Sequence, residues 1–397
     1  MRAGVLGILA LAFACGVARS AYADLTCLVN VAVTPQLRHE GLVELTGDIV
    51  LVCSGTAPES GITGPLTVTL NTEVTSRLLG GTSEALLLIN EPPPGSQTLG
   101  TNLFEGVVSG NTVTFNNVPF APPPGGTITN RVLRITNVRA DVTSLVVGTQ
   151  AAPVSATVST TLASIDITSP RQIVGFVQDS FLFSPDPVCT GPDGIIEVRF
   201  TELFGTAFKI QGMTNQDVPG TIYNTESGFT PKPFITGVGL ADSGTELGLA
   251  ISGLPPGAHL SVPPAITEGM LTIKAIQPPG GGIVPVVGGA ATIVYEVTIA
   301  DPNQSQGITI PITTSGVVVP LPPGAVGPTV RGTLYPISTV ATASATDPIP
   351  RFVDASTPQP FGRECRGAPV MGAVSLVALG LGLLGIGVLM VRRRSTS

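Results

Sequence analysis

The sequence predicts an all-β protein made of two antiparallel β-sandwich domains, with an export signal before them and a membrane helix after them. The 397 residues include 48 glycines and 37 prolines, a larger share than in ordinary globular chains, so turns are frequent. Apolar residues make up 43% of the chain, which is enough for a core and argues against disorder. Short stretches rich in Val, Thr and Ile lie between the turns and have the composition of strands.

The N-terminus has the pattern of a signal peptide over residues 1–23. A basic residue, Arg2, precedes an apolar stretch that runs from residue 5 to residue 17. The small residues Ala21 and Ala23 then form the small-x-small pattern that signal peptidase cleaves. We therefore expect the chain to be exported.

The clearest strand pattern covers residues 37–53, where two sets of side chains alternate. Alternation with period two predicts one buried face and one face in water. The predicted buried face comprises Leu37, His39, Val43, Leu45, Ile49, Leu51 and Cys53. The predicted exposed face comprises Arg38, Glu40, Glu44, Thr46 and Asp48. Residues 107–118 are predicted to form a hairpin, with Val113 and Phe115 on one face.

The part of the chain between the two apolar ends is long enough for two domains of ordinary size. We place the first, Ig-like or jelly-roll-like, at residues 24–169 and a second of the same kind at 170–352. One short helix is expected at Thr201–Ile210, across one end of a sandwich. Residues 353–369 contain two prolines before the C-terminal cysteine and few apolar side chains, which is typical of a stalk.

The C-terminus predicts a single-pass membrane helix at residues 370–391, followed by a cytoplasmic basic tail at 392–397. The span has no charged residue, and its length matches the roughly 30 Å hydrocarbon core of a bilayer. Basic residues stay on the cytoplasmic side of a membrane. The C-terminus is therefore predicted to lie inside because of Arg392, Arg393 and Arg394.

The cysteines predict one disulfide and leave a second pair open. Cys27 and Cys53 lie on the buried parity of neighbouring strands, so they are the preferred pair in an oxidising compartment. Cys189, in a surface turn, and Cys365, in the stalk, form a doubtful second pair. Cys15 offers a rival interpretation as a lipoprotein cysteine, although the residues before it lack the usual leucine.

Charge and composition argue against several classes of function. Charged residues make up 11% of the chain, its net charge is −7, and no Lys/Arg cluster lies outside the C-terminal tail. Nucleic acid is therefore not expected as a partner. The two histidines, His39 and His259, stand alone, and His39 is interpreted as a core or rim residue. We predict no catalytic, metal-binding or cofactor-binding residue, and no cofactor.

The end of the chain resembles the tripartite C-terminal sorting signals of exported bacterial surface proteins, the group that includes the PEP-CTERM and IPTL types. The resemblance combines a motif, a membrane helix and an arginine cluster over about 30 residues, and Pro369, Val370 and Met371 are nearest the Pro-Thr-Leu core of the IPTL type. Two positions depart from that motif, and the Pro-Glu-Pro of the other type is missing. The resemblance implies a sorting protease that cuts near the motif and releases or re-anchors the protein. It also implies a processing role for Cys365, which competes with the disulfide.

The second predicted domain is similar to uncharacterised secreted β-sandwich proteins of bacteria. The similar segments are Val198–Glu202, Ala207–Lys209, Ala343–Ala345 and Pro348–Phe352. This resemblance implies a shared fold and supplies no site.

Together these features predict an exported cell-envelope or matrix protein, membrane-anchored or sorted, that is structural, adhesive or ligand-binding rather than an enzyme. The expected partners are the membrane, signal peptidase, a sorting protease and components of the envelope or matrix. The alternative is an extracellular hydrolase or carbohydrate-active enzyme that uses paired carboxylates. Two carboxyls converging in a concave pocket, with shifted pKa values, would favour that alternative.

Overall fold

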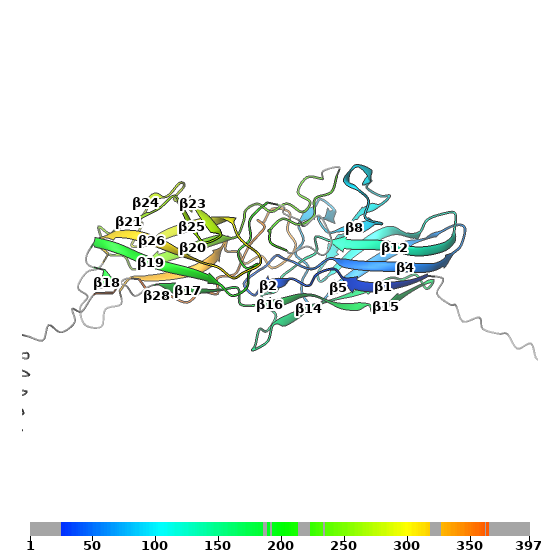
Figure 1. Ribbon diagram of the computed structural model, residues 1–397, viewed down its shortest axis with the longest axis horizontal. Helices are drawn as coiled ribbons and strands as arrows, with labels where there is room; N and C mark the ends of the chain where they lie inside the picture. Colours follow the sequence, from blue (N-terminus) through cyan, green and yellow to red (C-terminus); the bar gives the residue numbers. More distant parts are fainter. Residues whose placement is uncertain are drawn as a thin grey trace, which may run out of the picture.

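The computed structural model describes residues 25–185, 189–190, 193–212, 223–232, 235–317, 327–361 and 363–364. They form two β-sandwiches that lie end to end along the long axis of the molecule (Figure 1). Across these ranges the only helical element is one 3₁₀ turn, η1 (Pro94–Ser96). The predicted fold class, all-β with two sandwich domains, is confirmed.

The predicted signal peptide, membrane helix and basic tail lie outside the described residues. Among the residues that are described, no helix is long and apolar enough to cross a membrane.

The first sandwich consists of two six-stranded sheets that share one apolar core. The first sheet has the order β15 (Ile165–Thr168), β1 (Leu25–Val31), β4 (Ile49–Ala57), β12 (Gly126–Thr136), β8 (Leu86–Ile89) and β9 (Leu103–Glu105). The second has the order β10 (Val107–Ser109), β11 (Thr112–Ala121), β5 (Ile62–Leu70), β14 (Ala152–Ser159), β16 (Arg171–Gln178) and β2 (Gln36–Arg38). Strands β1 and β15 pair in parallel, as do β16 and β2, and the other pairs in these sheets are antiparallel.

The second sandwich consists of a five-stranded and a six-stranded sheet around a separate apolar core. The five-stranded sheet has the order β17 (Phe181–Pro185), β19 (Asp193–Glu202), β26 (Gly307–Ser315), β21 (His259–Val262) and β24 (Gly282–Val284). The six-stranded sheet has the order β22 (Ala265–Glu268), β23 (Leu271–Gln277), β25 (Ala291–Ile299), β20 (Glu246–Ser252), β27 (Thr329–Tyr335) and β28 (Gln359–Pro360).

Three short ladders complete the described strands. They are β3 (Glu44–Leu45) with β13 (Arg139–Ala140), β6 (Leu78–Leu79) with β7 (Thr82–Ser83), and β18 (Cys189–Thr190) with β29 (Arg363–Glu364).

The strands of each sandwich extend beyond the predicted domain boundaries. Strand β16 pairs with β14 and β2 of the first sandwich, where Val174 and Val177 are buried, so that sandwich continues past residue 169 to Gln178. Only Asp179 and Ser180 then precede β17 of the second sandwich. Phe361, in the predicted stalk, is fully buried in the second core, and its N–H donates to the Pro328 carbonyl. Residues 359–361 therefore belong to the second sandwich.

The strand predicted at residues 37–53 is divided among β2, β3 and β4. The predicted inner face is buried at Leu37, Leu45 and Cys53, as expected. The predicted outer face is wrong, because Arg38, Glu44, Thr46 and Asp48 are at most 4% exposed. Residues from the second half of the chain cover this face, as described below. The predicted hairpin at residues 107–118 is confirmed as β10 and β11, with Val113 and Phe115 fully buried.

The helix expected at Thr201–Ile210 does not form. Strand β19 extends through Glu202, which pairs with Phe181 of β17, and the chain then turns. The Glu202 carboxylate accepts the N–H of Phe208 at 2.7 Å and the N–H of Gln306 at 2.9 Å. These bonds hold the loops that contain Phe208 and Gln306 against the end of the sheet. They also use the N–H of Phe208, which would donate within the chain if a helix formed.

The pKa of Glu202 predicts a local pH dependence of stability. Burial outweighs the two N–H bonds and raises the pKa of this carboxyl to about 7. Between its ordinary pKa of 4.5 and about 7, the folded state keeps a proton that the unfolded state has lost. The contribution of Glu202 to the free energy of unfolding therefore falls as pH rises through this window, by at most about 3 kcal/mol.

Glu202→Gln should remove this slope, measured as urea unfolding between pH ~5 and ~8. If the wild type and the variant lose stability in parallel over that range, Glu202 is not the group responsible.

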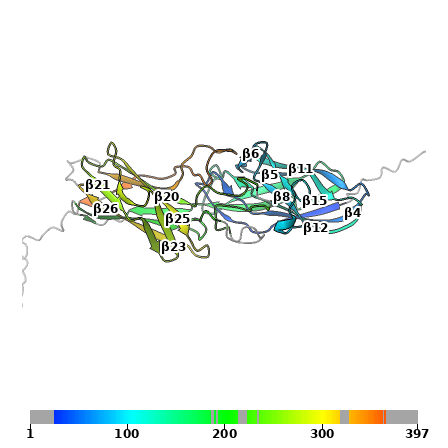
Figure 2. The ribbon, with the colours of Figure 1, turned by 90° about the horizontal axis from the view of Figure 1, so that it is seen from above.

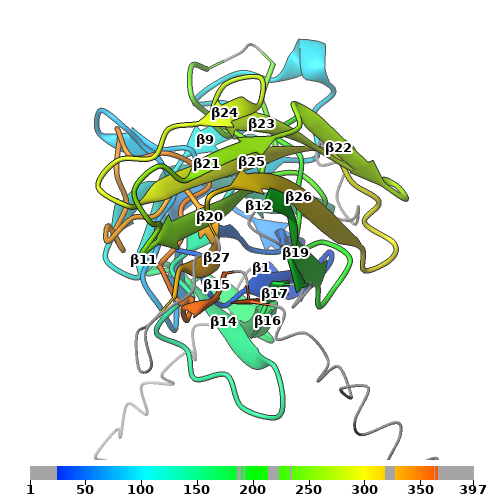
Figure 3. The ribbon, with the colours of Figure 1, turned by 90° about the vertical axis from the view of Figure 1, so that its left-hand side faces the viewer.

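Two segments of the second half reach back over the end of the first sandwich (Figure 2). One connects β19 to β20, and the other follows β27. The N–H of Leu42 donates to Arg351, the N–H of Val353 donates to Glu40, and the N–H of Leu78 donates to Ser344. Viewed along the long axis, the two sandwiches lie one behind the other (Figure 3).

Candidate functional site

A cluster of buried polar side chains joins the two sandwiches. We call it the junction cluster, and each of its members is at most 2% exposed. The first sandwich provides Arg38 from β2, Glu44 from β3, Glu84 after β7, and Arg139 from β13. The second half provides Lys209 and Glu226 from the β19–β20 connection, and Thr245 just before β20.

Arg38 lies at the centre of the junction cluster and contacts carboxylates from both halves of the chain. Its Nη1 and Nη2 donate to the two oxygens of Glu226 at 2.6 and 2.9 Å, and its Nε donates to Glu44 at 2.8 Å. Nη1 also donates to Thr245, and the guanidinium lies 4.7 Å from the centre of the Phe352 ring. A bidentate pair of this kind fixes both partners in one geometry.

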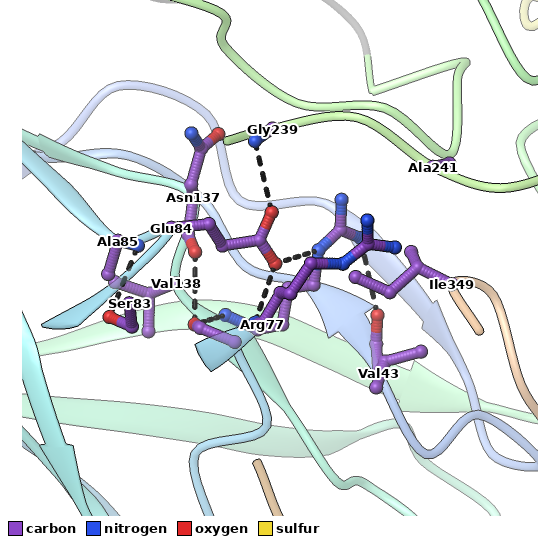
Figure 4. A network of polar contacts seen from close by, with 12 residues as sticks. Val43, Arg77, Ser83, Glu84, Ala85, Asn137, Val138, Gly239, Ala241 and Ile349 are labelled. Atoms are coloured by element: carbon purple, nitrogen blue, oxygen red, sulfur yellow. Dashed lines mark hydrogen bonds and ion pairs between the residues drawn. The ribbon is translucent and has the colours of Figure 1, made fainter. Parts of the chain in front are cut away.

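Arg139 and Glu84 form a second ion pair in the junction cluster. Arg139 Nε lies 3.0 Å from Glu84 Oε1, and its Nη2 donates to the backbone carbonyl of Glu226 at 2.8 Å. Figure 4 shows Glu84 between the Arg77 backbone on one side and the N–H of Gly239 on the other, which donates to Oε2 at 3.1 Å. Glu84 therefore connects the first sandwich to the β19–β20 connection.

The opposite charges of the junction cluster offset the free-energy cost of burying them. Burial alone lowers the pKa of Arg38, but Glu226 and Glu44 outweigh it and raise that pKa. At Glu226, burial acts to raise the pKa, and Arg38 outweighs it, so the carboxyl stays ionised below its usual range. Burial lowers the pKa of Lys209, whose Nζ lies 3.7 Å from Glu44. The cluster is sealed from solvent, so it can hold the two halves together but cannot admit a substrate.

The predicted disulfide between Cys27 and Cys53 is confirmed. The two cysteines lie directly opposite each other on β1 and β4, in the core of the first sandwich. Cys189 pairs through its backbone with Arg363 in the β18–β29 ladder, two residues before Cys365. The side chain of Cys189 and the whole of Cys365 lie outside the described residues, so the second pair stays a prediction.

The other predicted site residues are those of cleavage and sorting. The cleavage and sorting residues Ala21, Ala23, Pro369, Val370, Met371, Arg392, Arg393 and Arg394 all lie outside the described residues. The histidines are both described and lie far apart in the fold, His39 in the loop after β2 and His259 at the start of β21. Within the described ranges, no group of three or more His, Cys, Asp or Glu residues could hold a metal ion.

A cleft of about 300 Å³ opens at the boundary between the sandwiches, and we call it the boundary cleft. Its polar wall includes His39, Glu40 and Asp179 from the first sandwich and the short connection that follows it. Its apolar wall is formed by Phe181, Leu182, Phe183 and Leu203. The remaining lining comes from β27 and from the segment that leads to β28: Gly332, Thr333, Ala355, Ser356, Thr357 and Gln359.

Glu40 is the most unusual group of the boundary cleft. The residue is 9% exposed, and the structure gives its Oε2 no hydrogen-bond partner. Burial raises the pKa of this carboxyl, against hydrogen bonds from the N–H of Glu40 itself and from the side chain and N–H of Ser180. Asp179 shares the cleft and lies 3.4 Å from His39 Nδ1. The alternating pattern of residues 37–53 predicts a solvated position for Glu40, so the sequence gives no signal for this cleft.

Comparison with known proteins gives distant structural likeness and no family. No protein-family model and no curated protein matches the chain. A serine-rich repeat adhesion glycoprotein from Streptococcus agalactiae shares 10% identity, with a TM-score of 0.24 over 86% of this chain and 97% of that one. A biofilm-associated protein B domain shares 8%, with a TM-score of 0.22 over 85% and 86%.

The collagen-binding domain of an Erysipelothrix rhusiopathiae surface protein gives 10% identity and a TM-score of 0.16 over 84% and 94%. Every one of these TM-scores is below 0.5. The function proposed next therefore rests on the geometry of the chain itself.

Proposed function

We propose that the chain is an exported cell-envelope protein whose two sandwiches act as one rigid, elongated body with a structural or adhesive role. The observation that carries this proposal is the junction cluster, which buries charged side chains from both halves in one network. Separating the halves would part Arg38 from Glu226, and Glu84 from the N–H of Gly239. These bonds form only while the two halves stay packed together, so they oppose bending at the junction.

The location outside the cytoplasm is also part of the proposal. The Cys27–Cys53 disulfide is compatible with an oxidising compartment, and the predicted signal peptide gives a route to it. The predicted helix at 370–391 would anchor the body in the membrane or mark it for a sorting protease. Signal peptidase, that protease and components of the envelope or matrix are the proposed partners.

Surface labelling and an attachment assay on the source cells test this proposal together. Antibody against the purified ectodomain should label intact cells, and a strain that lacks the chain should attach or cohere less than its parent. Small-angle scattering of the ectodomain should give one elongated particle of fixed length. Unlabelled intact cells, or scattering that requires a broad range of lengths, would contradict it.

One observation favours the hydrolase alternative enough to test it. The boundary cleft brings together Glu40, whose pKa is raised by burial, and Asp179, which is the pattern of an acid and a base. Incubating the wild type and Glu40→Gln with soluble and envelope polysaccharides separates the two functions. Release of reducing ends by the wild type alone would establish the enzyme and overturn the structural proposal.

A further inference from the structure

We propose that the end of the second sandwich that lies away from the first docks on the membrane surface, where Ile283 and Val287 enter the lipid headgroup layer. This end is formed by β24 and the connection of residues 285–290 that follows it, and we call it the apolar tip. The inference rests on the membrane anchor of the proposed function. It adds a second contact between the chain and the bilayer.

The first step of the argument is the exposure of two large apolar side chains on the apolar tip. Ile283, in the edge strand β24, is 79% exposed, and Val287 is 76% exposed. Val284, between them, is buried in the second core, so this part of the chain is held to the sandwich while its neighbours face outward. Apolar surface in water is unfavourable, and contact with lipid removes that cost.

The second step is the lack of charge around these two side chains. The sequence has no Asp, Glu, Lys or Arg in residues 275–295, which include β24 and the connections on both sides of it. Within the five-stranded sheet, all residues of these four types lie on β19, three strands away from β24. Burying a charge is the largest cost of leaving water, and the apolar tip avoids it.

A second uncharged connection lies beside the first. It follows β20 at residues 253–258, and the N–H of Leu254 donates to the carbonyl of Gly289 at 2.9 Å. Residues 247–267 likewise contain no Asp, Glu, Lys or Arg, and His259 is their one titratable residue. Two adjacent connections at this end of the sandwich therefore present an uncharged surface.

The third step is the strand register, which places the last described residues at the same end as the apolar tip. Asp193, at the start of β19 and just after β18, pairs with Ser315, and Ser315 pairs with His259. The next residue of β21, Leu260, pairs with Val284 at the end of β24. Strands β18, β21 and β24 accordingly lie toward the left-hand end of the molecule in Figure 1.

The distance from this end to the predicted membrane helix is short. Glu364 ends β29, the partner of β18, and residues 365–369 separate it from the helix predicted at 370–391. Five residues span at most about 18 Å when fully extended. The headgroup layer on each side of the hydrocarbon core is about 5–8 Å thick. A helix that begins at the membrane surface therefore keeps the apolar tip within reach of the headgroups, which favours lipid as its partner.

A tryptophan reporter tests the docking, because the chain has no tryptophan of its own. The full chain with Val287→Trp is reconstituted in phosphatidylcholine vesicles, with or without bromine on the acyl chains, which quenches indole fluorescence on contact. We expect brominated lipid to remove at least about half of the emission, because interfacial side chains lie about 5–10 Å into the boundary between headgroups and acyl chains. Val146→Trp is the matched control, since Val146 is 88% exposed in the first sandwich and should not be quenched.

Two results would overturn the proposal. One is equal quenching of the two reporters, or quenching of neither. The other is emission from Val287→Trp that shifts to shorter wavelength without loss in brominated lipid, which would indicate that a second copy of the chain covers the apolar tip.

Ile283→Asp places a charge on the apolar tip at an exposed position, where folding should not suffer. Added to Val287→Trp, it should reduce the loss of emission in brominated lipid at least about twofold, because a carboxylate is costly to move out of water. Ile173→Asp, on β16 of the first sandwich, makes the same change at an exposed isoleucine and should leave the loss unaltered. Equal effects of the two aspartates would contradict a contact at the apolar tip.

Alkaline extraction of the same vesicles tests the anchor on which this inference rests. The full chain should stay with the lipid. Its release would overturn the anchor and the docking together. Retention of the chain without quenching of Val287→Trp would overturn the docking alone and leave the proposed function in place.

Discussion

Replacing Arg38 with methionine is expected to lower the free energy of unfolding by about 3–5 kcal/mol. The methionine keeps most of the side-chain volume but leaves Glu44 and Glu226 buried without the guanidinium that both contact at 2.6 Å. An uncompensated buried carboxylate is costly whether it stays ionised or takes up a proton. Urea unfolding followed by far-ultraviolet circular dichroism measures the change, since the chain has no tryptophan for fluorescence.

Arg171→Met is the matched control, because Arg171 lies on the exposed start of β16. It should change the free energy of unfolding by less than about 0.5 kcal/mol. The double variant Arg38→Met, Glu226→Gln should be less destabilised than the sum of the two single variants, because each removes a partner of the other. A loss of under about 1 kcal/mol for Arg38→Met would put the Arg38–Glu226 pair in the range of surface ion pairs. It would contradict the proposal that the junction cluster holds the two sandwiches together.

Removing the Cys27–Cys53 disulfide is expected to lower the free energy of unfolding by about 3–4 kcal/mol. The bridge joins residues that are 26 apart in the sequence, so it restricts a substantial loop of the unfolded chain. Cys27→Ala with Cys53→Ala tests this by urea unfolding under oxidising conditions. Both side chains are fully buried, so the smaller alanines add a packing loss to the effect of the bridge.

Wild-type protein unfolded in the presence of reductant separates the two effects, because it loses the bridge and keeps both sulfur atoms. Its stability should lie between those of the oxidised wild type and the double variant. Peptide mapping without reductant should recover the bridge from exported protein. Free thiols at both positions would contradict the pairing, and equal stability with and without reductant would contradict its contribution.

Local patterns in the sequence were enough to predict the fold class and the disulfide. Alternation with period two marks a half-buried strand wherever one face meets a core, and Leu37, Leu45 and Cys53 obey that rule. Frequent proline and glycine indicated the many turns between the strands. The same reasoning failed at Thr201–Ile210. Phe204, Ala207 and Phe208 have helical spacing and are buried in the core, but they lie in a turn and not in a helix. The tertiary bonds to Glu202 decide that segment.

The junction cluster was not predictable from these patterns, because its partners are far apart in the sequence. Arg38 and Glu226 are 188 residues apart, and nothing near Arg38 indicates that a second domain covers its side of the strand. A polar side chain on an alternating strand is normally solvated, and that expectation placed Arg38, Glu44 and Asp48 in water. Glu40 was assigned to the same face, so the boundary cleft was missed for the same reason.

The placement of the first and last described strands has a mechanical consequence. Strand β1 lies in the sandwich at one end of the molecule and the β18–β29 ladder at the other, and β1 runs roughly along the long axis (Figure 1). A pull on the two chain ends would load the β1–β4 ladder in shear, so its hydrogen bonds, which run across the strands, would bear the force together. The Cys27–Cys53 bridge prevents β1 from sliding past β4. The β1–β4 ladder and its disulfide would therefore resist a force applied along the long axis of the molecule.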